Sequence, residues 1–367
     1  SARRQRQMCI RDRVGTLRQL PQRPTPEHRA AALKFLIEEF LGDFPLNTPS
    51  SRAHVLALLL STVLRHVIDG PVPLFLLEAP TAGTGKSLLA DVVSLAAVGV
   101  SAQKNTLPES EAELRKTITS LLMNAEPLVL FDNVVRSLDS GKLAALLTAD
   151  RWSDRALNTN RTMTLRNRSI WMVTANNPSL SRELARRSVR IRLDAGVEDP
   201  WMRIVAFRHS DLPAWVKKNR GLILGALITL YRGWLLDGAA PSVARMGSFE
   251  SWTALVGGVI EAAGVPGFLV GNFADVHIVD PEEADWQKLV SLWWEAHGAA
   301  HVGTRELIAL AQEHELLGVS PDSSSYSLRS LLGRGLKKRK DRIYGDHQIT
   351  LGRDRARKQN WYALAAV

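Results

Sequence analysis

The chain has 367 residues, of which 45% are hydrophobic and 23% are charged. This composition is typical of a globular protein with two or three domains, and it excludes collagen, a disulfide scaffold and wholesale disorder. The longest uncharged apolar runs, Val55–Leu64 and Gly221–Tyr231, are shorter than the roughly 18 residues of a membrane span. Cys9 is the only cysteine, so no disulfide can form within the chain. We therefore expect a cytoplasmic protein with no membrane partner.

Basic charge is concentrated at the two ends of the chain. The formal net charge is +10, with +6 in residues 1–29 and +7 in residues 321–367, so residues 30–320 carry −3. Basic ends on a mildly acidic body predict local contact with a polyanion. The string Met8–Arg13 resembles translated sequencing adapter. We therefore expect the basic tail, residues 1–25, to be partly non-native and the chain to be a piece of a longer polypeptide.

The first predicted elements are two helices in residues 26–70. Thr25-Pro26 has the sequence of an N-cap followed by proline at the first helical position, which predicts a helix to about Leu41. A second helix is predicted over about 51–68 because apolar residues recur there at helical spacing. These residues are Leu56, Leu59, Leu60, Val63, Leu64 and Val67.

Strands alternate with helices over residues 71–195. Short apolar runs predict buried strands at Leu74–Leu77, Leu128–Phe131 and Ile170–Val173, and period-two alternation predicts a less buried one at Val189–Leu193. Between them we expect helices at Lys86–Val98, Ser110–Met123, Ser140–Leu147 and Ser181–Arg187, and a hairpin at Arg155–Arg166. This order predicts an α/β core with a mostly parallel sheet. Residues 196–272 are predicted to be helical.

A glycine-rich loop, PTAGTGKS, lies between the first strand and the next helix. In this context backbone N–H groups hold phosphates at the helix N-terminus, Lys86 reaches the β- and γ-phosphates, and Ser87 ligates magnesium. Pro80 replaces the glycine of the strict pattern, but that residue begins the turn and does not contact phosphate. The expected nucleotide-binding residues are Pro80, Thr81, Ala82, Gly83, Thr84, Gly85, Lys86, Ser87 and Leu88.

Two later strands end in polar residues that suit the same site. Asp132, at the end of the second buried strand, is the expected second magnesium ligand. Asn133 follows it where ATPases of this kind usually have glutamate, and an amide can orient water but cannot accept its proton. Asn176, in preference to Asn177, could contact the γ-phosphate or the attacking water, although Asn-Asn-Pro also suits a simple turn.

Arg186 and Arg187 lie at the end of a predicted helix. Either could enter a neighbouring subunit's site as an arginine finger, and a solvated basic helix end is the structural alternative. The candidate catalytic residues are therefore Lys86, Asp132, Asn133, Asn176, Arg186 and Arg187.

In this order the motifs resemble the AAA+ (P-loop, ASCE) ATPase core over residues 71–195. Over about residues 50–272 the chain resembles ATPase/helicase proteins of prophages and integrative elements, often the C-terminal half of primase–helicase polypeptides. The matching segments are APTAGTGKS, LFDNV, TANN, LARRSVRIRLD, GSFESW (Gly247–Trp252) and AGVPGFL (Ala263–Leu269). The resemblance implies a helical lid at 196–272, ATP and Mg2+ as cofactors, and a DNA-associated homo-oligomer, typically a hexameric ring. Arg245 could then be a lid arginine or a surface residue.

Residues 273–367 resemble a winged-helix domain: helices at Asp285–His297, Arg305–Leu316 and Leu328–Ile343, then a hairpin. The last helix is expected to bury Leu328, Leu331, Leu332 and Leu336 and to present Arg334, Lys337, Lys338, Arg339, Lys340 and Arg342. The hairpin loop contains Arg353, Arg355, Arg357 and Lys358, a cluster that favours a nucleic-acid partner over a solvated tail. Trp361 and Tyr362 are expected in the core. His297 and His301 have helical spacing but no third ligand nearby, so no zinc site is predicted.

The sequence thus predicts a magnesium–ATP-dependent ATPase that binds single-stranded or duplex DNA, as a replicative helicase of a phage or mobile element in a bacterial or infected cell. A primase domain or protein is the expected further partner. The hairpin Arg155–Arg166, with Arg161 near its turn, is a candidate DNA contact. Asn133 favours an alternative, a slowly hydrolysing ATP-switched scaffold or helicase loader. A winged-helix regulator with a vestigial nucleotide fold is the weakest alternative, because Lys86, Ser87 and Asp132 are all present.

Overall fold

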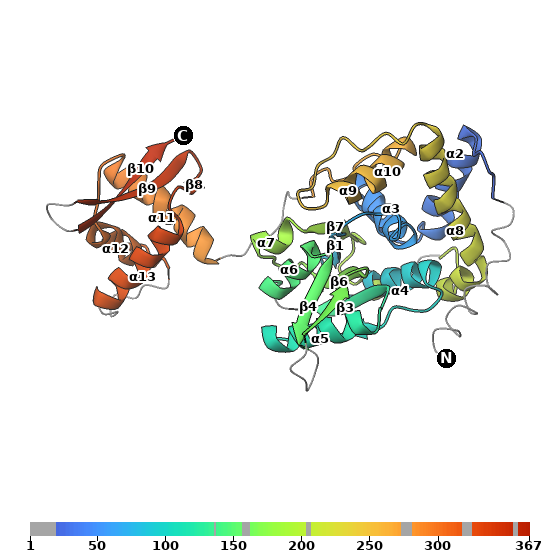
Figure 1. Cartoon of the computed structure of the whole chain (residues 1–367), viewed down its shortest axis with the longest axis horizontal. Coiled ribbons are helices and arrows are strands. Elements are labelled where there is room, and N and C mark those ends of the chain that lie inside the picture. The colour runs from blue at the N-terminus through green and yellow to red at the C-terminus, as the bar shows by residue number, and fades with distance from the viewer. Residues whose placement is uncertain are drawn as a thin grey trace. The chain divides into compact units, whose positions relative to one another are not determined.

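The computed structural model describes residues 20–135, 137–155, 162–202, 207–272, 281–317, 325–354 and 359–367. The chain divides into two compact units, Ser1–Ile278 and Val279–Val367 (Figure 1). Most of the predicted basic tail lies outside the described residues. Among the described helices, none combines the length and the apolar character that a bilayer crossing requires.

A five-stranded parallel sheet, in the order β2-β3-β6-β1-β7, forms the centre of the larger unit. Its strands are β1 (Leu74–Ala79), β2 (Lys104–Asn105), β3 (Leu128–Val134), β6 (Ile170–Asn176) and β7 (Ser188–Arg192). The predicted α/β core with a parallel sheet is confirmed. Since parallel strands end at the same edge, the segments after β1, β3 and β6 are brought together there, although they are far apart in the sequence.

The helices that connect these strands begin at residues whose side chains cap them. They are α4 (Lys86–Ala97), α5 (Glu111–Met123), α6 (Gly141–Thr148) and α7 (Arg182–Ala185). The hydroxyls of Ser110, Ser140 and Ser181 each accept a hydrogen bond from the backbone N–H three residues later, which satisfies a free donor of the first turn. α4 is the exception, because it begins after Gly85, whose φ of 96° is left-handed.

The remaining helices of this unit pack beside the sheet. They are α2 (Pro26–Lys34) with a π-helical continuation (Phe35–Phe40), α3 (Pro49–Val63), α8 (Leu212–Leu236), α9 (Glu250–Trp252) and α10 (Gly258–Ala262). α3 was predicted to bury one stripe, but Ala53–Leu60 is buried on all sides because α3 lies between β7 and the helices α8 and α10. Val67 falls beyond the end of α3 and is 51% exposed, so its predicted place in the stripe is wrong.

Two segments without derivable chemistry, GSFESW and AGVPGFL, connect residues 247–269 to α3. Trp252 is fully buried, and its indole N–H donates to Ser61 Oγ at 2.7 Å. Phe268 packs against both Trp252 and His54. Leu269 N–H donates to His54 Nε2 at 3.1 Å. Packing against α3 therefore explains why these two segments contain Trp252, Phe268 and Leu269.

His54 joins three parts of this unit. Because its Nε2 accepts the Leu269 N–H, its Nδ1 carries the proton and donates to the carbonyl of Arg190 in β7 at 2.5 Å. Burial lowers the pKa of His54 from 6.5 to about 4, so the ring is neutral at physiological pH. One imidazole thus links α3, the segment around Leu269 and the edge strand of the sheet.

A two-stranded hairpin, β4 (Arg151–Arg155) and β5 (Thr162–Arg166), packs against α5 in the larger unit. It is anchored by Asp154, a buried carboxylate that accepts from Arg115 at 2.8 Å and from Thr119 at 2.5 Å, both on α5. The hairpin was predicted to begin at Arg155 and instead begins four residues earlier. Its tip, including Arg161, lies outside the described residues, whereas Arg155 and Arg166 are exposed.

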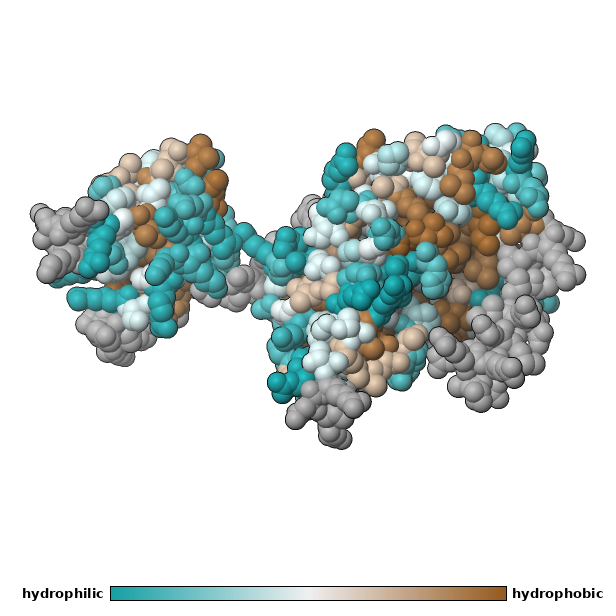
Figure 2. All heavy atoms as spheres, viewed as in Figure 1, coloured by the Kyte–Doolittle hydropathy of each residue, from teal (hydrophilic) through white to brown (hydrophobic). Residues whose placement is uncertain are grey.

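The smaller unit contains three helices and an antiparallel sheet in the order β10-β9-β8. The elements are α11 (Pro281–His297), α12 (Thr304–Glu313), α13 (Ser325–Lys338), β8 (Ile343–Tyr344), β9 (His347–Asp354) and β10 (Gln359–Ala366). Val302, between α11 and α12, bridges to Tyr362 of β10. On the face shown in Figure 2, hydrophilic residues cover most of this unit, whereas the larger unit has a hydrophobic area near α3, α4 and α8.

Several side chains of the smaller unit differ from the sequence prediction. Leu331 was placed in the core but is 44% exposed, whereas Arg339 was placed on the surface and is 3% exposed. The Arg339 guanidinium lies 4.5 Å from the Trp286 ring centroid and donates to Tyr344 Oη at 3.0 Å. Helix α13 ends at Lys338, so Arg339 no longer follows its helical face. Tyr362 is in the core as predicted, but Trp361 is only half-buried.

Candidate nucleotide site and basic surface

The glycine-rich loop joins β1 to α4 at the carboxyl edge of the sheet. Gly83 and Gly85 have φ values of 78° and 96°, which side chains with a Cβ rarely adopt. The loop therefore turns sharply and leaves Lys86 at the first position of α4, where the ammonium group is buried. Its Nζ lies 3.4 Å from the carbonyl oxygen of Thr81 and 3.5 Å from Thr84 Oγ1. The lysine is thus folded over the loop that contains it.

Lys86 also contacts the end of the neighbouring strand β6. Its Nζ donates to Asn176 Oδ1 at 2.6 Å, a contact made possible because Asn176 pairs with Ala79 of β1. Asn177, the other candidate, instead accepts from Arg192 at 3.2 Å. Burial lowers the pKa of Lys86 and the nearby Asp132 carboxylate opposes that shift. The structure therefore brings Asn176, and not Asn177, to the lysine.

Asp132 lies beside Ser87, the other predicted magnesium ligand. Its Oδ1 accepts from Ser87 Oγ at 2.7 Å and from Thr174 Oγ1 at 2.6 Å, and Lys104 Nζ lies 3.8 Å from Oδ2. Thr174 and Lys104 were not predicted to be site residues. Thr174 could have been found, because residues 174 and 176 share one face of a strand. Lys104 gave no such signal, since β2 has only two residues.

The pair formed by Ser87 and Asp132 fits magnesium. A hydroxyl and a carboxylate are hard oxygen donors, and Mg2+ is usually held by one or two such groups together with phosphates and water. Ser87 Oγ and Asp132 Oδ1 already converge, and Thr174 fixes the carboxylate by a hydrogen bond. No group of three or more His, Cys, Asp or Glu side chains suited to a metal occurs among the described residues. The described residues therefore contain no site in which protein side chains alone would surround a metal ion.

Asn133 occupies an irregular position at the end of β3. The pairing of β3 with β6 shifts between Phe131 and Val134, and Asn133 has a left-handed φ of 54°. Its backbone N–H donates to Thr174 Oγ1 at 2.7 Å, while its side chain is exposed. The irregularity thus presents the side chains of two consecutive residues, Asp132 and Asn133, at the edge of the sheet.

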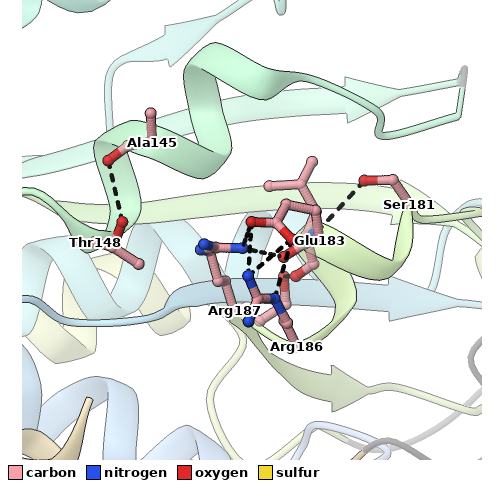
Figure 3. A network of polar contacts seen from close by, with 8 residues as sticks. Ala145, Thr148, Ser181, Glu183, Arg186 and Arg187 are labelled. Carbon is pink, nitrogen blue, oxygen red and sulfur yellow. Dashed lines mark hydrogen bonds and ion pairs between the residues drawn. The ribbon is translucent and has the colours of Figure 1, made fainter. Parts of the chain in front are cut away.

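Arg186 and Arg187 share one carboxylate, that of Glu183 in α7 (Figure 3). Arg187 is held against its own chain, since its side chain is only 12% exposed and it also donates to the Glu183 carbonyl at 2.9 Å. Arg186 is 61% exposed and meets Glu183 at 2.8 Å. Hydrogen bonding from Arg186 lowers the pKa of Glu183. Arg186 is therefore the better placed of the two for contact with another molecule.

Both arginines are at the amino edge of the sheet. The carbonyl of Arg187 accepts from the N–H of Leu74, the first residue of β1, whereas Lys86 follows the other end of that strand. Six residues of strand separate the two edges, roughly 15–20 Å. Neither arginine therefore reaches the glycine-rich loop of the same chain.

Arg245 lies on the loop between α8 and α9 and is exposed. It lines a cavity of about 460 Å³ together with Glu261 and residues 265–270. None of the residues that line this cavity belongs to the glycine-rich loop.

The exposed cations of the smaller unit lie mainly on α13 and just after it. Those that the structure describes there are Arg329, Arg334, Lys337, Lys338 and Lys340. Arg353, near the end of β9, is also exposed, while Arg355, Arg357 and Lys358 lie outside the described residues. Arg342, predicted to be free, instead pairs with Glu283 at 3.0 Å. Exposed cations are thus present on and just after α13, but Arg339 and Arg342, which were predicted to be among them, form ion pairs with Glu283.

The sequence matches no family model and no curated protein. Similar solved structures include the apo NrS-1 C-terminal region, with 13% identity, a TM-score of 0.44, and coverage of 96% of this chain and 78% of that chain. The active helicase Cch of SCCmec type IV is similar with 10% identity, a TM-score of 0.36, and coverage of 95% of this chain and 72% of that chain. JCV helicase is similar with 15% identity, a TM-score of 0.27, and coverage of 77% of this chain and 76% of that chain. With these scores the likenesses carry no argument about activity, so function is argued from the residues themselves.

Proposed function

We propose that this chain is a magnesium–ATP-dependent DNA-binding ATPase, acting as a ring-forming replicative DNA helicase of a phage or mobile element. One observation carries the proposal: the carboxyl edge of the sheet brings Lys86 to Asn176 at 2.6 Å and Ser87 to Asp132 at 2.7 Å. Burying a lysine side chain costs free energy, and a turn that only joined a strand to a helix would not need a lysine between the glycine-rich loop and a second strand. Lysine, serine and aspartate at this place are the residue types that hold phosphates and Mg2+ in phosphoryl-transfer sites, and the Asn176 amide could position water.

In this proposal the side chains that now hold each other would exchange partners when nucleotide binds. The Lys86 ammonium would leave Asn176 for phosphate oxygens, and backbone N–H groups of Gly83–Lys86 would take the remaining phosphate charge. Mg2+ held by Ser87 and Asp132 would neutralise the phosphates and orient them. Asn176, released from Lys86, would then orient the attacking water.

Completion of the site requires a second copy of the chain. Arg186 lies at the edge of the sheet opposite to its own glycine-rich loop, so it could serve only a neighbouring subunit. This geometry supports a homo-oligomeric ring, and a hexamer is the assembly that the family resemblance implies. A primase, as a domain or a separate protein, is the further partner that we propose.

DNA contact is assigned to two places. The smaller unit, with its three helices and β9–β10 hairpin, is proposed to be a winged-helix-like domain that places α13 against DNA. The β4–β5 hairpin of the larger unit, with exposed Arg155 and Arg166, is proposed as a second contact. Phosphate contacts by these cations would give affinity for both single strands and duplexes.

The test is ATP hydrolysis and strand displacement on forked DNA, with and without single-stranded DNA as activator. We expect DNA to stimulate hydrolysis and Lys86→Ala to lower it by about 10²–10³-fold. Lys116→Ala, which removes an exposed lysine paired with Glu113 on α5, is the matched control and should keep wild-type rates. A wild-type protein that binds no magnesium nucleotide would refute the proposal.

Asn133 supports a second candidate, an ATP-switched scaffold or helicase loader. Its amide stands where a carboxylate would activate water, and no proton acceptor replaces it at that position. Tight binding of ATP with negligible turnover, and assembly on DNA that depends on ATP but not on hydrolysis, would favour this candidate over the motor.

A further inference from the structure

An exposed tryptophan lies against the glycine-rich loop. Trp201 belongs to a single 3-10 turn (Pro200–Met202) that follows β7. A Cβ on Gly83 would lie 3.1 Å from Trp201 Cβ and 3.2 Å from the indole carbon Cε3. Nevertheless 62% of Trp201 is exposed to solvent. Trp201 therefore lies beside the loop with its backbone N, its Cβ and one edge of the indole, and it leaves most of its surface uncovered.

A second aromatic ring faces the other left-handed glycine of the loop. Phe44 Cε1 lies 3.6 Å from where a Cβ on Gly85 would be, and Phe44 is buried. The segments that carry the two rings are tied together: Asp194 N–H donates to the Pro45 carbonyl at 3.0 Å, and Asn47 Nδ2 donates to the Asp194 carbonyl at 2.7 Å. The glycine-rich loop thus has one buried and one exposed aromatic neighbour.

The difference between the two rings indicates their roles. Phe44 is buried, as a ring that only supports the loop should be, whereas an exposed indole of this size carries an unused apolar surface. A nucleobase is joined to its phosphates through one sugar, so it must lie beside the loop that holds the phosphates. Aromatic side chains bind bases by stacking, and removing such a ring costs about 1–3 kcal/mol per base.

We propose that Trp201 is the platform on which the base of the bound nucleotide stacks. The site then takes purine nucleoside triphosphates in preference to pyrimidine nucleoside triphosphates or bare triphosphate, because a purine offers the larger stacking area. This inference rests on the proposed nucleotide site. It adds a residue that selects for the base, outside the loop that holds the phosphates.

Isothermal titration of the full chain with MgATP, MgCTP and magnesium tripolyphosphate tests the assignment. Trp201→Ala should raise the Kd for MgATP about 10-fold, raise that for MgCTP less, and leave tripolyphosphate within twofold. Trp201→Phe should restore most of the affinity for MgATP. Val100→Ala is the matched control, since Val100 is 61% exposed but follows the far end of α4, and it should change none of the three constants.

The possible failures are distinguishable. If Trp201→Ala leaves MgATP binding unchanged while the wild type binds it, the assignment of Trp201 is wrong and the nucleotide site stands. If Trp201→Ala weakens MgATP and tripolyphosphate equally, Trp201 shapes the loop and does not bind the base. Tighter binding of both would mean that the indole blocks the loop. If the wild type binds none of the three probes, the proposed function itself fails.

Discussion

The proposed contact of α13 with DNA can be tested by removing two of the exposed cations of this helix. Lys337 and Lys338 are both exposed at the end of this helix. Each phosphate contact contributes about 0.9 to the slope of log Kobs against log salt concentration on duplex DNA. If both lysines contact phosphates, Lys337→Ala/Lys338→Ala should make the slope less steep by about 1.8. Between 50 and 200 mM salt the variant should therefore lose roughly 12-fold less affinity than the wild type.

The assay is fluorescence anisotropy of a labelled duplex titrated with the full chain over a salt series. The single variant Lys337→Ala should change the slope by about half as much, and Lys288→Ala, an exposed lysine on α11, should not change it. Deletion of residues 321–367 is a poorer experiment, because it removes α13 and the hairpin from α11 and exposes Trp286 and Trp293, which are buried. A slope for the double variant equal to that of the wild type would refute the contact of α13 with DNA.

Three further outcomes are expected. The pKa of His54 falls from 6.5 in the unfolded chain to about 4 in the folded one, so the unfolded state binds more protons between these pH values. The free energy of unfolding should therefore drop by about 3 kcal/mol as pH falls from 6.5 to 4. His54→Gln should make this pH dependence weaker in denaturant titrations. Gly335→Ala should destabilise the smaller unit by about 1–3 kcal/mol, because its Cβ would lie 2.4 Å from the Trp286 ring, whereas Gly333→Ala has room and should not, as thermal unfolding would show. Arg186→Ala and Lys86→Ala, each inactive alone, should regain ATPase activity when mixed, because one subunit then supplies the loop and its neighbour the arginine; no recovery in mixed oligomers would contradict a finger in trans.

The sequence alone determined the local features of this protein. Strand–loop–helix order around PTAGTGKS, the buried runs that become β1, β3 and β6, and the serine caps of the helices all follow from residues close together in the chain. Each depends on backbone preferences and short-range hydrogen bonds, which is why the parallel α/β core was predictable. The same reasoning located Lys86, Ser87, Asp132 and Asn176 as residues that end or begin elements at one edge.

Only the tertiary structure decided between residues that sequence leaves equivalent. Asn176 reaches Lys86 and Asn177 does not, because the register of β6 against β1 fixes which amide faces the lysine. Likewise, Arg187 is withdrawn while Arg186 is exposed, because packing of α7 before β7 covers one guanidinium and not the other. Trp201 and Gly83 meet although they are far apart in the chain. Such contacts depend on pairing and packing between distant segments, and no local pattern encodes them.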